Sequence, residues 1–221
     1  MSSARVFRSL ALLLPLLGAC VPYTVGSTAQ TVPRGTISSA ASLSFIPGGL
    51  DPYADEEWES ESATFAMFDF EGRFGLDARS DIGVRIPTLS GIVVNYKRRL
   101  DGDTTGTRSA LAAMVGGGFV NMGEHAHFEA SLIASGPERS TLTPYGGLRA
   151  MQVLPLSSSA ASDSPTLGIF GGLRIGTREL GVSPELGIFY DRSTLGLRSN
   201  SIIFVPAVTV HGEGLRRVLW F

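Results

Sequence analysis

Apolar and polar residues alternate along most of the segment from Phe65 to Leu100. The apolar set includes Phe68, Phe70, Phe74 and Leu76, and the intervening set includes Asp69, Glu71 and Arg73. A period of two places the two sets on opposite faces of a β-strand. Because the second face carries full charges between large aromatics, the pattern favours a barrel with an apolar outer surface and a polar interior.

The same alternation continues through the rest of the chain and predicts about ten strands, within a range of eight to twelve. They cover residues 35–46, 63–76, 80–87, 90–100, 108–120, 125–135, 141–153, the stretches around Leu167–Ile175 and Glu185–Asp191, and 201–211. The 27 glycines are spread through the apolar stretches, as is typical of a curved all-β chain. The predicted fold is therefore all-β, an up-and-down antiparallel transmembrane β-barrel.

The lengths of the predicted connections agree with this topology. The three longest connections, residues 47–62, 154–165 and 192–200, follow the first, seventh and ninth predicted strands. In an up-and-down barrel all three lie at the same end. Outer-membrane barrels place long loops outside the cell and short turns in the periplasm, and they have an even strand number.

The first 19 residues are predicted to be a signal peptide. Arg5 and Arg8 precede an apolar run, Leu10–Leu17, that is too short to span a bilayer as a helix. The run closes with Leu17-Gly18-Ala19-Cys20, which resembles the lipobox of bacterial lipoproteins. This resemblance implies that Cys20 is lipidated and becomes the mature N-terminus. The alternative is a simple secretory signal in which Cys20, the only cysteine, is incidental.

The remaining chain divides into two predicted parts. Residues 20–34 lack periodicity and contain Pro, Thr and Ser, which predicts a flexible tether that begins at the short-turn end. Residues 35–221 form the predicted β-barrel domain. No apolar run after Cys20 reaches the length of a transmembrane helix, so strands must form any membrane span.

Two further stretches carry a resemblance to bacterial outer-membrane β-barrels. The C-terminal Trp220-Phe221 resembles the recognition signal of these proteins, and RFGLDARSDIGVRIP (residues 73–87) resembles the strand–turn–strand unit of their small members. This resemblance implies an outer-membrane location, and the lipobox resemblance adds a lipid anchor at Cys20. It also implies two partners. One is the lipid of the outer membrane, and the other is the barrel-assembly machinery, which would recognise Phe221.

The interior of the predicted barrel should hold charges of both signs. The predicted lumen network comprises Asp69, Glu71, Arg73, Arg85, Lys97, Glu129, Arg149, Arg174, Glu185 and Asp191. A small barrel is largely filled by its side chains, so opposite charges on neighbouring strands should pair, and Glu185 with Arg174 is the predicted pair. The alternative is a narrow pore in which a ring of charges sets selectivity. On the outer parity, Tyr96 and Tyr190 are candidates for an interfacial girdle.

Candidate chemistry is sparse. His125, His127 and Glu129 share one strand face and could converge on a metal, or on a hydroxyl such as that of Ser131, as in a lipid-modifying barrel enzyme. The sequence has no nucleophile elbow or HExxH motif, and a polar lumen or rim accounts for these residues and for His211. The acidic loop at 47–62 lacks the spaced pattern of a calcium loop. No catalytic, cofactor or metal site is therefore predicted.

Composition narrows the function classes. The net charge of −2 and the lack of a basic cluster argue against nucleic-acid binding, and 43% hydrophobic residues are too many for a disordered chain. The predicted function is that of an outer-membrane β-barrel lipoprotein with a structural or surface-interaction role. The alternatives are a small-solute channel and a periplasmic, lipid-anchored β-barrel that binds an apolar ligand.

Overall fold

The computed structural model describes residues 21–46, 65–101, 106–138, 141–156, 165–191, 201–213 and 215. The predicted signal peptide, Cys20, the acidic loop at 47–62 and the C-terminal Phe221 lie outside these residues, as do most of the other two long connections.

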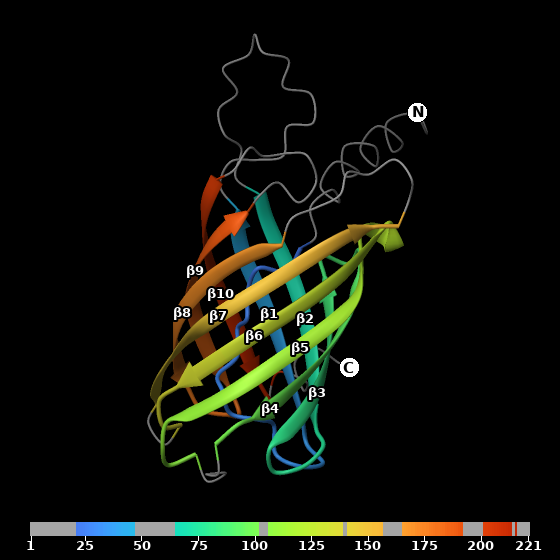
Figure 1. Cartoon of the computed structure of the whole chain (residues 1–221). Helices are drawn as coiled ribbons and strands as arrows, with labels where there is room; N and C mark the ends of the chain where they lie inside the picture. Colours follow the sequence, from blue (N-terminus) through green and yellow to red (C-terminus); the bar gives the residue numbers. More distant parts are fainter. Residues whose placement is uncertain are drawn as a thin grey trace, which may run out of the picture.

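Ten antiparallel strands form a closed barrel, as predicted (Figure 1). They are β1 (Ile37–Ile46), β2 (Phe65–Gly75), β3 (Ser80–Pro87), β4 (Ile92–Arg99), β5 (Ala110–Val120), β6 (His125–Ser135), β7 (Leu142–Pro155), β8 (Thr166–Gly176), β9 (Gly181–Asp191) and β10 (Ser201–Gly212). Each strand pairs with the next along the chain, and β1 pairs with β10 to close the sheet. Closure leaves no unpaired edge, which is the condition for strands to cross a bilayer.

The up-and-down order gives the barrel two distinct ends. The connections after β1, β7 and β9 join strands at one end, here called the long-loop end. The connections 76–79, 100–109, 136–141 and 177–180 lie at the opposite, short-turn end. One short 3-10 helix, η2 (Asn121–Gly123), connects β5 to β6 at the long-loop end. Among the described residues, no helix is long and apolar enough to cross a membrane.

Alternate residues of each strand face opposite sides of the barrel wall. In β3 the outward residues Ile82, Val84 and Ile86 are exposed, whereas Asp81 and Arg85 are buried inside. The same pattern gives an outer surface of exposed Phe, Leu, Ile and Val side chains around the barrel. Monomeric soluble proteins rarely expose contiguous apolar surface on this scale. A soluble barrel that binds an apolar ligand inside would carry polar side chains on its outer face, so this apolar outer surface disagrees with the periplasmic ligand-binding alternative.

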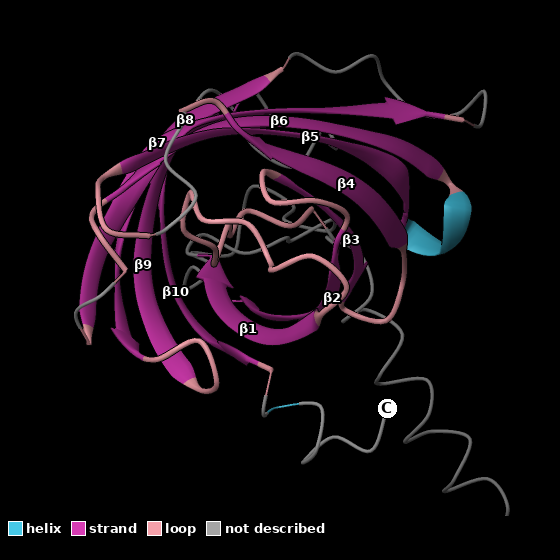
Figure 2. Ribbon diagram, turned by 90° about the horizontal axis from the view of Figure 1, so that it is seen from below, coloured by secondary structure: helices cyan, strands magenta, loops and turns pink. Residues whose placement is uncertain are grey.

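The segment at 21–34 lies inside the barrel, in contrast to the flexible tether expected for residues 20–34. Figure 2 shows coil crossing the space within the ring of strands. Most side chains between Val21 and Val32 are buried, Val25 and Ala29 almost completely. The segment 21–34 is called the plug from here on. The expectation failed because Pro, Thr and Ser content describes local conformation and gives no information on what surrounds a segment.

The plug runs the length of the lumen. Val21 and Tyr23 pack with Ile46, Val120 and Ile203, residues at or next to strand termini of the long-loop end. Further along, Val25 and Ala29 belong to a second apolar cluster with wall residues that include Ala112, Met114, Ile133, Tyr145 and Phe170. Arg34 then forms a bridge with Gly75 at the short-turn end, where the chain turns into β1. The segment therefore begins at the long-loop end and enters β1 from the short-turn end, so the prediction that it begins at the short-turn end was wrong.

Close contact between β6 and β7 requires a glycine. A Cβ atom added to Gly147 would lie 1.8 Å from the carbonyl oxygen of Leu132, whereas one added to Gly72 would meet nothing within 4 Å. We expect Gly147→Ala to destabilise the barrel by about 1–3 kcal/mol, because the neighbouring strand must shift. Gly72→Ala is the matched control and should leave stability unchanged. Urea titration of the heat-modifiable gel shift measures both, and equal stability of the two variants would contradict this packing.

Candidate functional site

The lumen wall carries a first ion-pair network on β2, β3 and β4. Arg73 donates from Nη1 to Glu71 Oε1 at 2.6 Å and to Asn95 Oδ1 at 2.6 Å, and from Nε to Asp81 Oδ1 at 2.9 Å. Arg85 donates to Glu71 Oε2 at 3.1 Å. Alternation places these side chains on one face, and antiparallel register sets Glu71 opposite Arg85.

Gly83 leaves the space that this network occupies. A Cβ atom at Gly83 would lie 2.7 Å from Asn95 Oδ1 and 2.8 Å from both Arg73 Nη1 and Glu71 Oε1. The three polar groups therefore meet directly above a residue with no side chain. A larger residue at this position would displace at least one of them.

A second network lies on β6 and β7. Arg149 donates from Nη2 to Glu129 Oε2 at 2.6 Å, and His127 Nε2 lies 3.4 Å from the same carboxylate oxygen. Ser131 Oγ accepts a longer contact from Arg149 Nη1, at 3.5 Å. All four side chains are buried.

Both networks extend to the backbone of the plug. Arg149 Nη2 donates to the carbonyl of Pro22 at 2.7 Å, and Arg85 Nη1 donates to the carbonyl of Thr24 at 2.9 Å. Lys97 Nζ donates to the carbonyl of Gln30 at 2.7 Å. The cations of the wall thus serve as partners for plug carbonyl groups.

Carboxylates of the wall bind the plug amides. Glu185 accepts the backbone N–H groups of Val25 and Gly26, each at 2.9 Å, and the hydroxyl of Tyr145 at 2.9 Å. Asp81 Oδ2 accepts the N–H of Val32 at 2.8 Å. Buried backbone groups need such partners, and a coil has no strand neighbour to supply them. Hydrogen bonds to charged groups contribute about 1.5–3 kcal/mol each, so the set holds the plug firmly.

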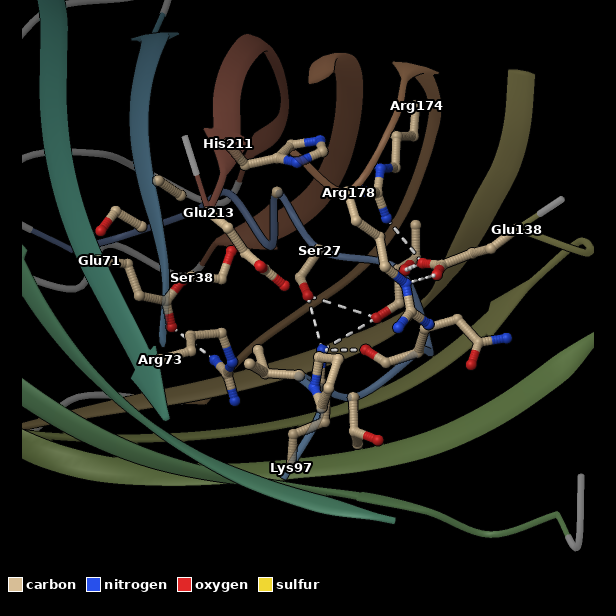
Figure 3. Close-up of a pocket in the computed structure, with 18 residues that line it drawn as sticks. Ser27, Ser38, Glu71, Arg73, Lys97, Glu138, Arg174, Arg178, His211 and Glu213 are labelled. Atoms are coloured by element: carbon tan, nitrogen blue, oxygen red, sulfur yellow. Dashed lines mark hydrogen bonds and ion pairs between the residues drawn. The ribbon is translucent and has the colours of Figure 1, made fainter. Parts of the chain in front are cut away.

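The predicted Glu185–Arg174 pair was wrong. Arg174 instead donates to Glu138 Oε1 at 2.7 Å, and Arg178 donates to Glu138 Oε2 at 2.8 Å (Figure 3). Glu185 lies opposite Gly172 in the register, deeper in the barrel, and its carboxylate is taken by the plug. Knowing that two strands are adjacent was therefore not enough to predict the pair. The partners also depend on how far along its strand each residue lies and on which groups the plug presents.

The other residues predicted for a site lie apart in the structure and have different partners. His125 Nδ1 lies 3.2 Å from Asn121 Nδ2, whereas His127 faces Glu129, so the two histidines have different partners. His211 Nε2 lies 2.8 Å from Ser183 Oγ at the short-turn end. Of the remaining predicted lumen residues, Asp69 is buried and accepts a contact from Thr24 Oγ1 at 3.3 Å. The side chain of Asp191 lies outside the described residues.

Sequence reasoning missed several groups that complete the lumen. Asp81 and Arg99 are buried and charged, and each shares the strand parity of a residue that was predicted, Arg85 and Lys97 respectively. This shared parity could have predicted from the sequence that both side chains face the lumen. The plug had a weaker signal, the alternation of Val21, Tyr23 and Val25 with smaller or polar residues.

Glu138 provides a pH-dependent contact in the turn between β6 and β7. Burial raises its pKa, but Arg174, Arg178 and a hydrogen bond from Thr28 together hold the pKa below the ordinary 4.5. A depressed carboxyl pKa adds stability above the ordinary value, and this stability is lost as the pH falls through the folded-state pKa.

Glu138→Gln should therefore destabilise the protein at pH 7 by on the order of 1–3 kcal/mol, because Arg174 loses a charged partner. The difference in Tm from the wild type should shrink as the pH falls from 5 to 3, measured by circular dichroism. Glu179→Gln, in the exposed β8–β9 turn, is the control. A difference that stays constant across this range would contradict the assigned role of the Glu138 carboxylate.

No family model matches the sequence, and no curated protein sequence matches it. Several solved barrels are similar in structure. Neisserial surface protein A (NspA) is 14% identical, with a TM-score of 0.42, over 80% of this chain and 96% of that protein. OprG from Pseudomonas aeruginosa is 12% identical, with a TM-score of 0.38, over 84% and 99%. The translocator domain of NalP from Neisseria meningitidis is 11% identical, with a TM-score of 0.43, over 95% of each chain. At these sequence identities and TM-scores, none of these proteins indicates a role for this chain or for any of its residues.

Proposed function

We propose that this chain is an outer-membrane β-barrel with a closed lumen and a structural or surface-interaction role. The closed ten-strand sheet and its apolar outer surface support a membrane-spanning barrel. Each large apolar side chain moved from water to hydrocarbon contributes about 1.5–3 kcal/mol, so a bilayer is the favourable solvent for this surface. The proposal includes outer-membrane lipids as partners and insertion by the assembly machinery through Phe221.

The observation that carries the closed-lumen proposal is the position of the plug. Its backbone is hydrogen-bonded to Glu185, Asp81, Lys97, Arg85 and Arg149 of the wall, and its apolar residues fill the space between them. A small-solute channel would need this segment displaced. The contact surface for a partner would then be the long-loop end, outside the lumen.

Planar-bilayer recording of the full-length protein tests this proposal. We expect no steady conductance from the wild type. Glu185→Ala should give intermittent openings, because the N–H groups of Val25 and Gly26 lose their acceptor. Glu179→Ala removes the same charge from the exposed β8–β9 turn and should behave as the wild type. Steady ion-selective conductance from the wild type would favour the channel alternative.

The proposal also includes a lipid on Cys20. Consecutive Cα atoms are about 3.8 Å apart, so such a lipid would attach next to Val21, which packs at the long-loop end. The acyl chains would then enter the leaflet at that end, not the periplasmic leaflet.

An epitope inserted between Cys20 and Val21 tests this orientation. It should bind antibody on intact cells, whereas the same epitope in the β2–β3 turn, after Asp77, should bind only after permeabilisation. The reverse result would contradict the orientation. Intact-protein mass spectrometry of the wild type and Cys20→Ser tests lipidation separately, as a loss of acyl mass in the variant.

A further inference from the structure

A polar cavity of about 220 Å³ lies at the short-turn end of the lumen. It is lined by the last plug residues, 30–34, by Ala78 of the β2–β3 turn, by Arg99 of β4 and by Arg178 of the β8–β9 turn. The cavity therefore combines groups from four separate parts of the chain at one mouth of the barrel.

Within the part of the chain that the structure describes, the charged side chains that line the cavity are Arg34, Arg99 and Arg178. Two of them have carboxylate partners outside the lining, since Arg99 Nε donates to Asp101 at 2.8 Å and Arg178 Nε donates to Glu138 at 2.8 Å. Arg34 is exposed and has no ion-pair partner within the described ranges. The cavity thus carries an excess of positive charge and of N–H donors.

Gln30 orients Arg99 in the lining of the cavity. Its side chain is 5% exposed, and its Oε1 accepts a hydrogen bond from Arg99 Nη1 at 2.6 Å. This bond fixes the orientation of the amide, because a guanidinium can only donate. Nε2 is left as a buried donor with no hydrogen-bond partner in the part of the chain that the structure describes. Gln30 and Asp101 together hold the Arg99 guanidinium in the lining of the cavity.

We propose that this cavity binds an oxyanion of the phosphate class. Arg34 and Arg178 supply charged donors from two sides of the lining. The planar guanidinium matches the oxygens of phosphate with paired N–H groups, which is why arginine is common at phosphate sites. The phosphate can be free or part of a larger headgroup, since both present the same oxygens. The cavity volume exceeds the roughly 30 Å³ of one water several-fold, which leaves room for such a group.

Titration of the full-length protein with inorganic phosphate, in an uncharged detergent and followed by calorimetry, tests the proposal. We expect saturable binding that weakens about tenfold in Arg34→Gln and in Arg178→Gln, because each loses a charge-assisted donor. Arg98→Gln is the matched control. It removes the same charge from the residue beside Arg99, but on the outer face of β4, and should change affinity less than twofold.

A fourth variant gives a change of opposite sign. Glu138→Gln frees Arg178 from its carboxylate and should strengthen phosphate binding several-fold, which a purely structural effect would not do. The gel mobility shift shows whether each variant still forms the barrel. Two results would overturn the proposal: no saturable binding by the folded wild type, or equal weakening in Arg98→Gln.

Nanodiscs distinguish the two sources of phosphate. If a lipid headgroup is the ligand, phosphatidylglycerol nanodiscs should lower the affinity for inorganic phosphate relative to phosphatidylcholine nanodiscs, and Arg34→Gln should abolish the difference. Equal affinity in both, with the variant effects retained, identifies a soluble phosphate ligand. A difference that persists in Arg34→Gln would overturn the assignment of this residue to the site.

Discussion

The interior of this barrel is organised by one requirement: the backbone of a coil enclosed in the lumen needs hydrogen-bond partners. A strand obtains them from its neighbours, but the plug has no paired strand over most of its length. The wall supplies them through charged side chains instead. Glu185 and Asp81 accept plug N–H groups, and Lys97, Arg85 and Arg149 donate to plug carbonyls. The charges of the lumen are therefore partners for the plug as well as for one another.

This arrangement explains why so many charges are tolerated inside a narrow barrel. An isolated buried ion is expensive, and even a well-formed buried pair offers little net stability. Here most of the charged groups have several partners, as when Glu71 receives bonds from Arg73, Arg85 and Asn95. Networks of this kind are favourable only when their members are satisfied. Removing one plug contact leaves a buried charge with fewer partners, as when Arg149 keeps only its wall contacts to Glu129 and Ser131. The position of the plug is therefore tied to the stability of the wall.

The two ends of the lumen differ in chemistry. At the long-loop end Val21 and Tyr23 close the lumen with apolar contacts, including an edge-on packing of Tyr23 against Phe189 at 5.1 Å between ring centroids. At the short-turn end the plug leaves a cavity, and the charged residues in its described lining are three arginines. A closed lumen with a cationic mouth fits binding at one end better than passage through the barrel.

The sequence by itself determined the strands and their division into an apolar and a charged face, because alternation with a period of two is a local property of each strand. It gave their number as about ten, within a range of eight to twelve, and the structure has ten. It also placed Asp69, Glu71, Arg73, Arg85, Lys97, Glu129, Arg149 and Glu185 on the inner face for the same reason. Tertiary structure alone decided which charges meet. Arg174 binds Glu138 in a turn and not Glu185 on the next strand, because depth along the barrel matters as well as strand adjacency. Only the closed barrel makes the segment at 21–34 a plug, since most of the strands that bury it lie far from it in the chain.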